Sequence, residues 1–79
     1  NNIENTILIY PNPSKNTFYI NSNINETFVL KIYNYLGKLI LEKNINQDKT
    51  KIELNVANGI YFVEALNVNT KKTIKLIIQ

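Results

Sequence analysis

Side chains suited to acid–base or nucleophilic chemistry are few and scattered in this 79-residue chain. It contains no His, so the usual general base and the commonest metal ligand are both absent. It contains no Cys, which excludes a thiolate nucleophile, a disulfide and a zinc–thiolate site. We therefore expect no catalytic residues, no metal and no cofactor; the one enzymatic alternative left open is a carboxylate dyad assembled by the fold. The carboxylates show no spacing that indicates shared work: Glu4, Glu26, Glu42, Asp48, Glu53 and Glu64.

Lysine alone carries the positive charge. The net charge is +3, and Arg, which supplies the bidentate contacts typical of phosphate and guanine recognition, is absent. The lysines are spread along the chain rather than clustered. This pattern predicts a mildly basic, solvated surface and no nucleic-acid partner.

Four tyrosines are the remaining candidates for ligand contact. If Tyr10, Tyr19, Tyr33 and Tyr35 gathered on one face, they would form an aromatic platform for sugar. That arrangement would make the chain a carbohydrate-binding or adhesive module. Tyrosines on strand faces also pack against each other across strands, so the fold decides between the two interpretations.

The elements that position these residues read as strands. Short runs of alternating apolar and polar residues are separated by turn signals, and no segment keeps a helical period. Strands joined at such short intervals are typical of an antiparallel sandwich, in which two packed sheets bury the apolar faces. We predict one all-β domain over residues 1–79, with strands at 6–10, 17–21, 28–33, 39–43, 51–56, 60–66 and 73–79.

The alternation also predicts which side chains face the core, except in the fourth run. There, either Ile40 or the pair Leu39 and Leu41 faces inward, and the choice stays open. Residues 21–25 are predicted to form a loop, and residues 44–50 a polar loop. The inward-facing residues elsewhere are Phe18, Ile20, Phe28, Leu30, Ile32, Ile52, Leu54, Val56, Tyr61, Val63, Ala65, Ile74, Leu76 and Ile78.

Proline and glycine mark the bends. Pro11 and Pro13 cannot sit inside a central strand, because each lacks the N–H that a ladder needs, and they predict an extended, kinked crossover. Gly37 is expected to take a positive φ and close a hairpin between the third and fourth runs. Gly59 is expected to form a turn or corner before the sixth run.

Tyr61 sits where immunoglobulin-like sandwiches place a tyrosine corner. In such a corner, a Tyr near the start of the penultimate strand lies two residues before a buried position, and its hydroxyl bonds backbone upstream. Val63 would be that buried residue. The prediction is therefore a two-sheet, antiparallel, immunoglobulin-like β-sandwich of about seven strands.

Four segments taken in chain order resemble a known family. They are Y-P-N-P from Tyr10 to Pro13, Y-x-x-x-G-K from Tyr33 to Lys38, G-x-Y-x-V from Gly59 to Val63, and an apolar strand around Lys75 at residues 72–79. Together they resemble the C-terminal sorting domain, in its type A form, of proteins exported by the type IX secretion system of Bacteroidetes. The pattern departs from the family at residues 67–70, where Asn replaces the Gly that is common in the last hairpin.

The resemblance implies a function as a sorting signal. The domain would stand at the C-terminus of a larger cargo protein, pass through the periplasm, and be bound by the type IX machinery. The cargo would then reach the cell surface or the extracellular space, usually after a surface sortase removes the domain. An exposed strand edge near the last hairpin would allow a partner to add a strand, and the open edge of the final strand would also allow dimerisation. The residues expected to carry recognition or shape it are Pro11, Asn12, Pro13, Tyr33, Gly37, Lys38, Gly59, Tyr61, Lys75, Leu76, Ile77 and Ile78.

Overall fold

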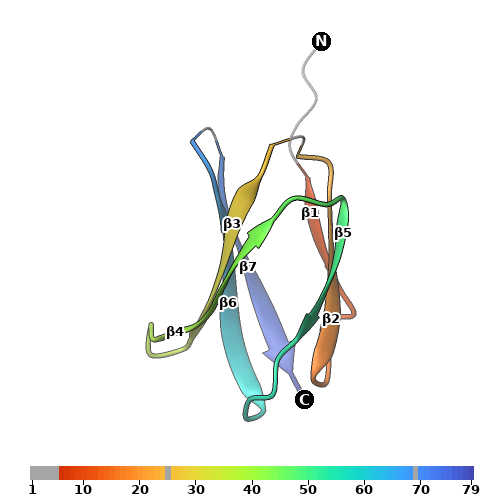
Figure 1. Cartoon of the computed structure of the whole chain (residues 1–79). Helices are drawn as coiled ribbons and strands as arrows, with labels where there is room; N and C mark the ends of the chain where they lie inside the picture. The colour runs from red at the N-terminus through yellow and green to blue at the C-terminus, as the bar shows by residue number, and fades with distance from the viewer. Residues whose placement is uncertain (1–5, 25, 69) are drawn as a thin grey trace.

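Seven strands form two facing antiparallel sheets (Figure 1). The computed structural model describes residues 6–24, 26–68 and 70–79, and no helix occurs within these ranges. One sheet has the order β1-β2-β5 and the other the order β4-β3-β6-β7. The predicted fold class is confirmed. The strands are β1 (Ile7–Tyr10), β2 (Thr17–Ser22), β3 (Phe28–Asn34), β4 (Leu39–Ile45), β5 (Lys49–Glu53), β6 (Gly59–Leu66) and β7 (Lys71–Ile78).

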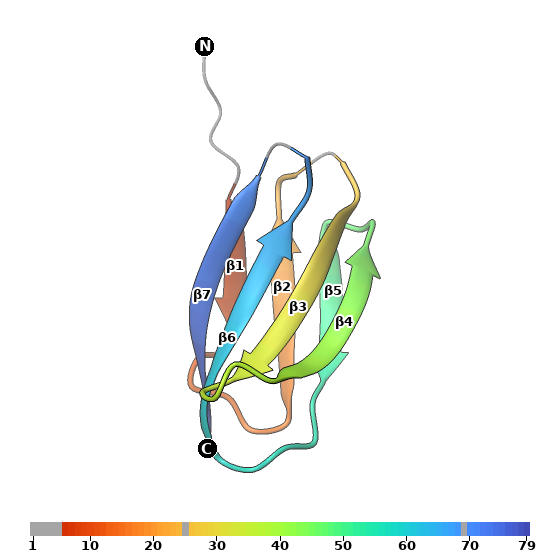
Figure 2. The same cartoon turned by 90° about the vertical axis from the view of Figure 1, so that its left-hand side faces the viewer.

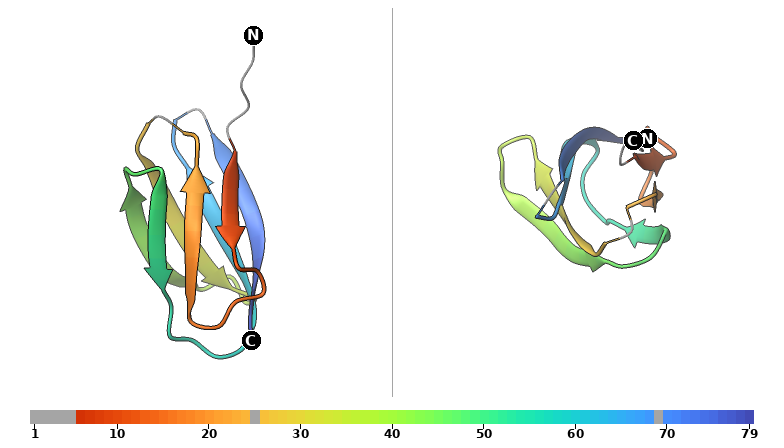
Figure 3. Two further views of the ribbon diagram at one scale, coloured as in Figure 1. Left: turned by 90° about the vertical axis from the view of Figure 1, so that its right-hand side faces the viewer. Right: turned by 90° about the horizontal axis from the view of Figure 1, so that it is seen from above.

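The two sheets lie as layers on either side of one core, as the view from above in Figure 3 shows. In constant-type immunoglobulin domains the fourth strand pairs with the fifth, in the sheet of the first two strands. Here β4 pairs with β3 instead, so the sheet that contains β6 and β7 is the larger one.

The inward-facing pattern of the sequence accounts for most of the core. Phe18, Leu30, Ile32 and Leu76 are fully buried, and the other predicted positions are buried or pack against the core. Alternation succeeds because each strand has one face against the opposite sheet and one face in solvent.

Two core residues lie in segments expected to be loops. Ile45 is 2% exposed because β4 continues past residue 43 and places it opposite Phe28. Ile24 is 7% exposed in the connection between β2 and β3. Each is a lone apolar residue among Asn, so no alternation in the sequence predicts that it is buried. Its burial is favourable because it removes apolar surface from water. The loop predicted at 21–25 begins only after Ser22, where β2 ends, and it contains Ile24; Asn25 lies outside the described residues. The loop predicted at 44–50 was wrong at both ends, because β4 runs to Ile45 and β5 spans Lys49–Glu53 instead of 51–56.

A β-bulge resolves the open question in the fourth run. Ile32 lies opposite Leu41 and Tyr33 lies opposite Leu39, so Ile40 is an extra residue in β4. Leu39 points outward with Tyr33 and is 43% exposed. Ile40 and Leu41 both pack against the core. Neither simple alternation was right, because the bulge brings two successive side chains to the core.

Candidate recognition surface

Segments far apart in sequence meet at one end of the sandwich. The ladders place Tyr33 opposite Phe62, which lies opposite Lys75, and Gly59 opposite Ile78. The chain between β1 and β2 and the turn between β3 and β4 lie at the same end (Figure 2). We call this end, formed by residues 11–14, 33–38, 59–62 and 75–78, the motif end. It brings together all of the residues that the sequence predicted to carry or shape recognition.

The segment after β1 crosses from one sheet to the other. The Ser14 N–H donates to the Ile77 carbonyl oxygen at 2.9 Å, and the Ser14 carbonyl oxygen accepts from the Gln79 N–H at 2.7 Å. These bonds make an isolated parallel bridge between Ser14 and Ile78. The kinked crossover predicted from Pro11 and Pro13 therefore becomes, at Ser14, a short parallel neighbour of β7.

The side-chain amide of Asn12 extends this pairing by acting as a peptide group would. Asn12 Nδ2 donates to the Lys75 carbonyl oxygen at 2.8 Å, and Asn12 Oδ1 accepts from the Ile77 N–H at 3.0 Å. A residue in a parallel strand would contact β7 in the same way, two positions before the Ser14 bridge. Pro11 and Pro13 have no N–H to donate, so the Asn12 side chain supplies the donor.

This crossover covers only one half of the outer edge of β7. Lys75 and Ile77 direct backbone groups away from β6 toward Asn12 and Ser14. Lys71 and Thr73 share that direction by the alternation of the strand, and no described strand pairs with them there. The open edge expected for the final strand therefore lies near the last hairpin, whereas the edge at residues 75–78 is occupied.

The turn between β3 and β4 is fixed by Asn34 and Gly37. Asn34 Oδ1 accepts from the N–H groups of Leu36 and Lys38, both at 2.9 Å, and the Gly37 N–H donates to the Asn34 carbonyl oxygen at 2.9 Å. Gly37 has a φ of 87°, as the turn prediction required. The turn projects outward and leaves Tyr35 and Leu36 73% and 75% exposed. The turn itself was predicted, but the role of the Asn34 side chain was not, although Asn side chains often bond the backbone of the turn that follows them.

The tyrosine corner is present. The Tyr61 hydroxyl donates to the Ala57 carbonyl oxygen at 2.6 Å, and Val63, two residues on, is 1% exposed. Gly59, just before the corner, has a φ of 155°, which side-chain-bearing residues rarely adopt. Gly59 and Tyr61 thus contribute to the motif end by fixing the backbone where β6 begins.

The four tyrosines do not form a common platform. Tyr10 and Tyr19 stack on the three-stranded sheet with ring centroids 5.9 Å apart, and Lys49 Nζ lies 5.1 Å from the Tyr19 centroid. Tyr33 is on the other sheet, and Tyr35 is in the turn that follows it. The structure therefore contradicts a four-tyrosine sugar platform, because two of the rings serve cross-strand packing in a different layer.

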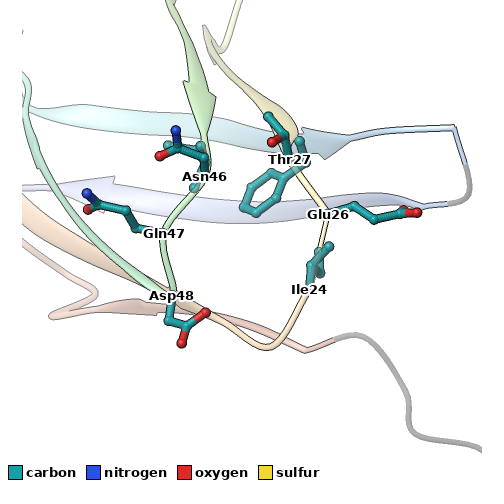
Figure 4. A pocket seen from close by; sticks show the side chains of 8 residues that line it. Ile24, Glu26, Thr27, Asn46, Gln47 and Asp48 are labelled. Atoms are coloured by element: carbon teal, nitrogen blue, oxygen red, sulfur yellow. The ribbon is translucent and has the colours of Figure 1, made fainter.

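A cavity of about 120 Å³ lies at the end opposite the motif end. Ile24, Phe28 and Ile45 line it together with polar residues of the β4–β5 connection. Figure 4 shows the Glu26 and Asp48 side chains pointing in different directions, so they form no carboxylate dyad. Within residues 6–24, 26–68 and 70–79, no three His, Cys, Asp or Glu side chains are grouped closely enough to hold a metal ion.

Comparison with known proteins identifies the family. The family model of the secretion system C-terminal sorting domain matches residues 8–79. No curated protein matches the chain. The described residues include no helix that is long and apolar enough to cross a membrane. The match spans β1 to β7 and includes all four motif segments. The chain therefore belongs to the secretion system C-terminal sorting domain family, the sorting signals of type IX secretion.

Proposed function

We propose that this domain is recognised through its motif end and that recognition there directs the attached cargo out of the cell. Membership of the family makes the chain a C-terminal sorting signal, attached to an N-terminal cargo, that interacts with the type IX machinery. It also implies export to the cell surface or the extracellular space. The family is one of signals rather than enzymes, and we propose no catalytic activity for this chain.

The observation that carries the proposal is the convergence of the four family segments at one end. β1 begins at the opposite end, with Ile7 opposite Ser22, and runs toward the motif end (Figure 3). A cargo joined ahead of β1 therefore attaches far from the motif end. That polarity suits a signal that serves unrelated cargoes, because the recognised surface stays the same and stays accessible.

Three finer steps belong to the same proposal. The cargo passes through the periplasm before the domain is bound, and a surface sortase then removes the domain. Dimerisation through an open edge stays a prediction. Among the described strands, β1, β4 and β5 each pair on one side alone, and β7 is open at Lys71 and Thr73. Lys43 on β4 is an edge charge of the kind that discourages strand addition.

Export of a periplasmic reporter fused ahead of the domain tests the proposal in a cell with type IX machinery. Replacing Tyr35 and Leu36 by Ser removes two exposed side chains from the motif end and should lower export while the fold survives. Val68→Ser is the control, because Val68 is 98% exposed in the hairpin at the other end. An intact fusion exported no better than the untagged reporter would refute the sorting function. Normal export of the Tyr35 and Leu36 variant would refute recognition through the motif end.

A further inference from the structure

The outer face of the four-stranded sheet is apolar at the motif end. Because Tyr61, Val63 and Leu76 point into the core, their neighbours Ile60, Phe62 and Ile77 point outward. The ladders place Leu39, Tyr33 and Phe62 in one row across the sheet, and Ile60 opposite Ile77 in the next. We call these residues the apolar face: Tyr33, Leu39, Ile60, Phe62 and Ile77. Figure 2 looks onto this side of the sheet.

Exposure of large apolar side chains is concentrated here. Eight such side chains are exposed in the described part of the chain, and five of them lie on the apolar face or in the adjoining turn. These are Tyr35, Leu36, Leu39, Ile60 and Phe62. Single exposed apolar residues are ordinary, but a contiguous group on one sheet face is typical of an interaction site.

Lysine supplies the charge that flanks the apolar face at the motif end. Farther up the same face, Lys31 lies between Glu42 and Glu64, and Lys71 Nζ lies 3.7 Å from Glu64 Oε2. That part of the sheet balances its own charges. At the motif end, Lys75 lies opposite Phe62 and Lys38 precedes Leu39, and no described carboxylate forms an ion pair with either lysine. Lys38 and Lys75 therefore border the apolar face without an ion-pair partner among the described residues.

The backbone groups at the edge of β7 in the motif end are already hydrogen-bonded within the domain. Asn12 and Ser14 occupy the edge of β7 from residue 75 onward, so a partner strand cannot pair there without displacing them. A partner at the motif end consequently meets side chains rather than open backbone. The outer face of the other sheet is less suited to docking, because Tyr10 and Tyr19 stack on each other and Lys49 lies over Tyr19.

We infer that the apolar face docks onto a protein whose surface is apolar at its centre and carries carboxylates at its rim. The carboxylates match Lys38 and Lys75, and the apolar centre covers Ile60 and Phe62. This inference rests on the proposed function and names the chemistry of the partner that recognises the motif end. Charge complementarity gives orientation and speed of association, while burial of the central side chains supplies most of the affinity.

The first experiment uses the reporter fusion with Ile60→Thr and Phe62→Thr combined. Both residues lie on β6, and Thr removes the apolar surface while its β-branched side chain still favours a strand. Export should fall about tenfold or more, the loss expected when side chains at the centre of an interface are truncated. The matched control combines Leu8→Thr, on the other sheet, with Leu66→Thr, on the same face of β6 at the far end. The control should export within about twofold of the intact fusion.

A second experiment reverses the charges without touching the apolar face. Lys38→Glu and Lys75→Glu combined should reduce export strongly, because carboxylates would then meet the acidic rim of the partner. Lys49→Glu and Lys51→Glu combined make the same change in net charge on the other sheet and should leave export nearly unchanged. Both lysines at the motif end are exposed, so this variant reads out docking even if the threonine variant unfolds.

Failure of the inference is separable from failure of the proposed function. If the intact fusion is not exported, the sorting function is wrong. If the intact fusion is exported and the charge-reversed variant, or a folded threonine variant, is exported equally well, only the inference is wrong. Two results would assign the apolar face to another occupant and also overturn the inference. One is a solution dimer that Phe62→Thr dissociates, and the other is glycan binding that the same substitution removes.

Discussion

Tyr61 joins a core position to the backbone of the preceding connection through one hydrogen bond. Its ring is buried, and its hydroxyl reaches the Ala57 carbonyl oxygen at 2.6 Å. The bond fixes the β5–β6 connection at Ala57 to the first turn-side residues of β6. Gly59 lies inside this closed segment, so the corner also fixes where β6 meets the end of β7.

Tyr61→Phe should destabilise the domain by about 1 kcal/mol, because one hydrogen bond is lost while the ring remains. Urea denaturation of the purified chain measures the change in the free energy of unfolding. Tyr35→Phe is the matched control, since the Tyr35 ring is 73% exposed, and its stability should equal that of the parent. An unchanged free energy for Tyr61→Phe would mean that the corner does not hold this connection.

Ser14, directly after the Y-P-N-P segment, contributes to the motif end through its backbone. Its N–H and carbonyl oxygen both pair with β7, whereas its buried Oγ has no hydrogen-bond partner among the described residues. A small side chain fits under the edge of β7, and the backbone supplies the bonds. The contribution of Ser14 to the crossover therefore comes from its main chain.

At the scale of elements, the β3–β4 hairpin depends on the left-handed conformation of Gly37. A Cβ added at Gly37 would meet no atom within 4 Å, so only the backbone strain of a positive φ opposes substitution. Gly37→Ala should cost about 1 kcal/mol or somewhat more, and Gly37→Asn should cost less, because Asn tolerates this region. Thermal unfolding of the two variants checks the order, and equal losses would show that the strain is not the cause.

At the outer edge of β7, the Asn12 side-chain amide makes the backbone hydrogen bonds that a neighbouring strand would otherwise make. Asn12→Ala removes two hydrogen bonds at a solvent-accessible edge and should cost about 1–2 kcal/mol. Hydrogen exchange should locate the loss, with faster exchange at the Ile77 amide than in the parent. Asn55→Ala, at an exposed position, serves as the control. Unchanged protection of Ile77 would contradict the role assigned to the Asn12 side chain.

At the scale of the whole molecule, the proposed function assigns different roles to the two ends of the sandwich. Cargo joins at the end where β1 begins, and the family segments gather at the other. An insertion of a few Gly and Ser residues between Tyr35 and Leu36 should abolish reporter export. The same insertion between Asn46 and Gln47, in the connection at the cargo end, should be tolerated because surface loops accept such insertions. Equal effects at both sites would contradict this polarity.

The sequence by itself determined that seven strands form, which side chains most of them bury, and where the chain bends. Alternation between apolar and polar residues has the period of a strand. It therefore predicted correctly that Phe18, Leu30 and Val63 face the core. The tyrosine corner and the Gly37 turn were also predictable, because each depends on residues close together in the chain.

The tertiary structure decided what depends on residues far apart. The bulge at Ile40, the burial of Ile24 and Ile45, and the pairing of the Asn12 amide with β7 are not encoded by any local period. Each follows from which strands lie side by side. The meeting of Tyr33, Phe62 and Lys75 in one row has the same origin. Register between strands is set by the packing of whole sheets, and that packing brings scattered motifs together on one surface.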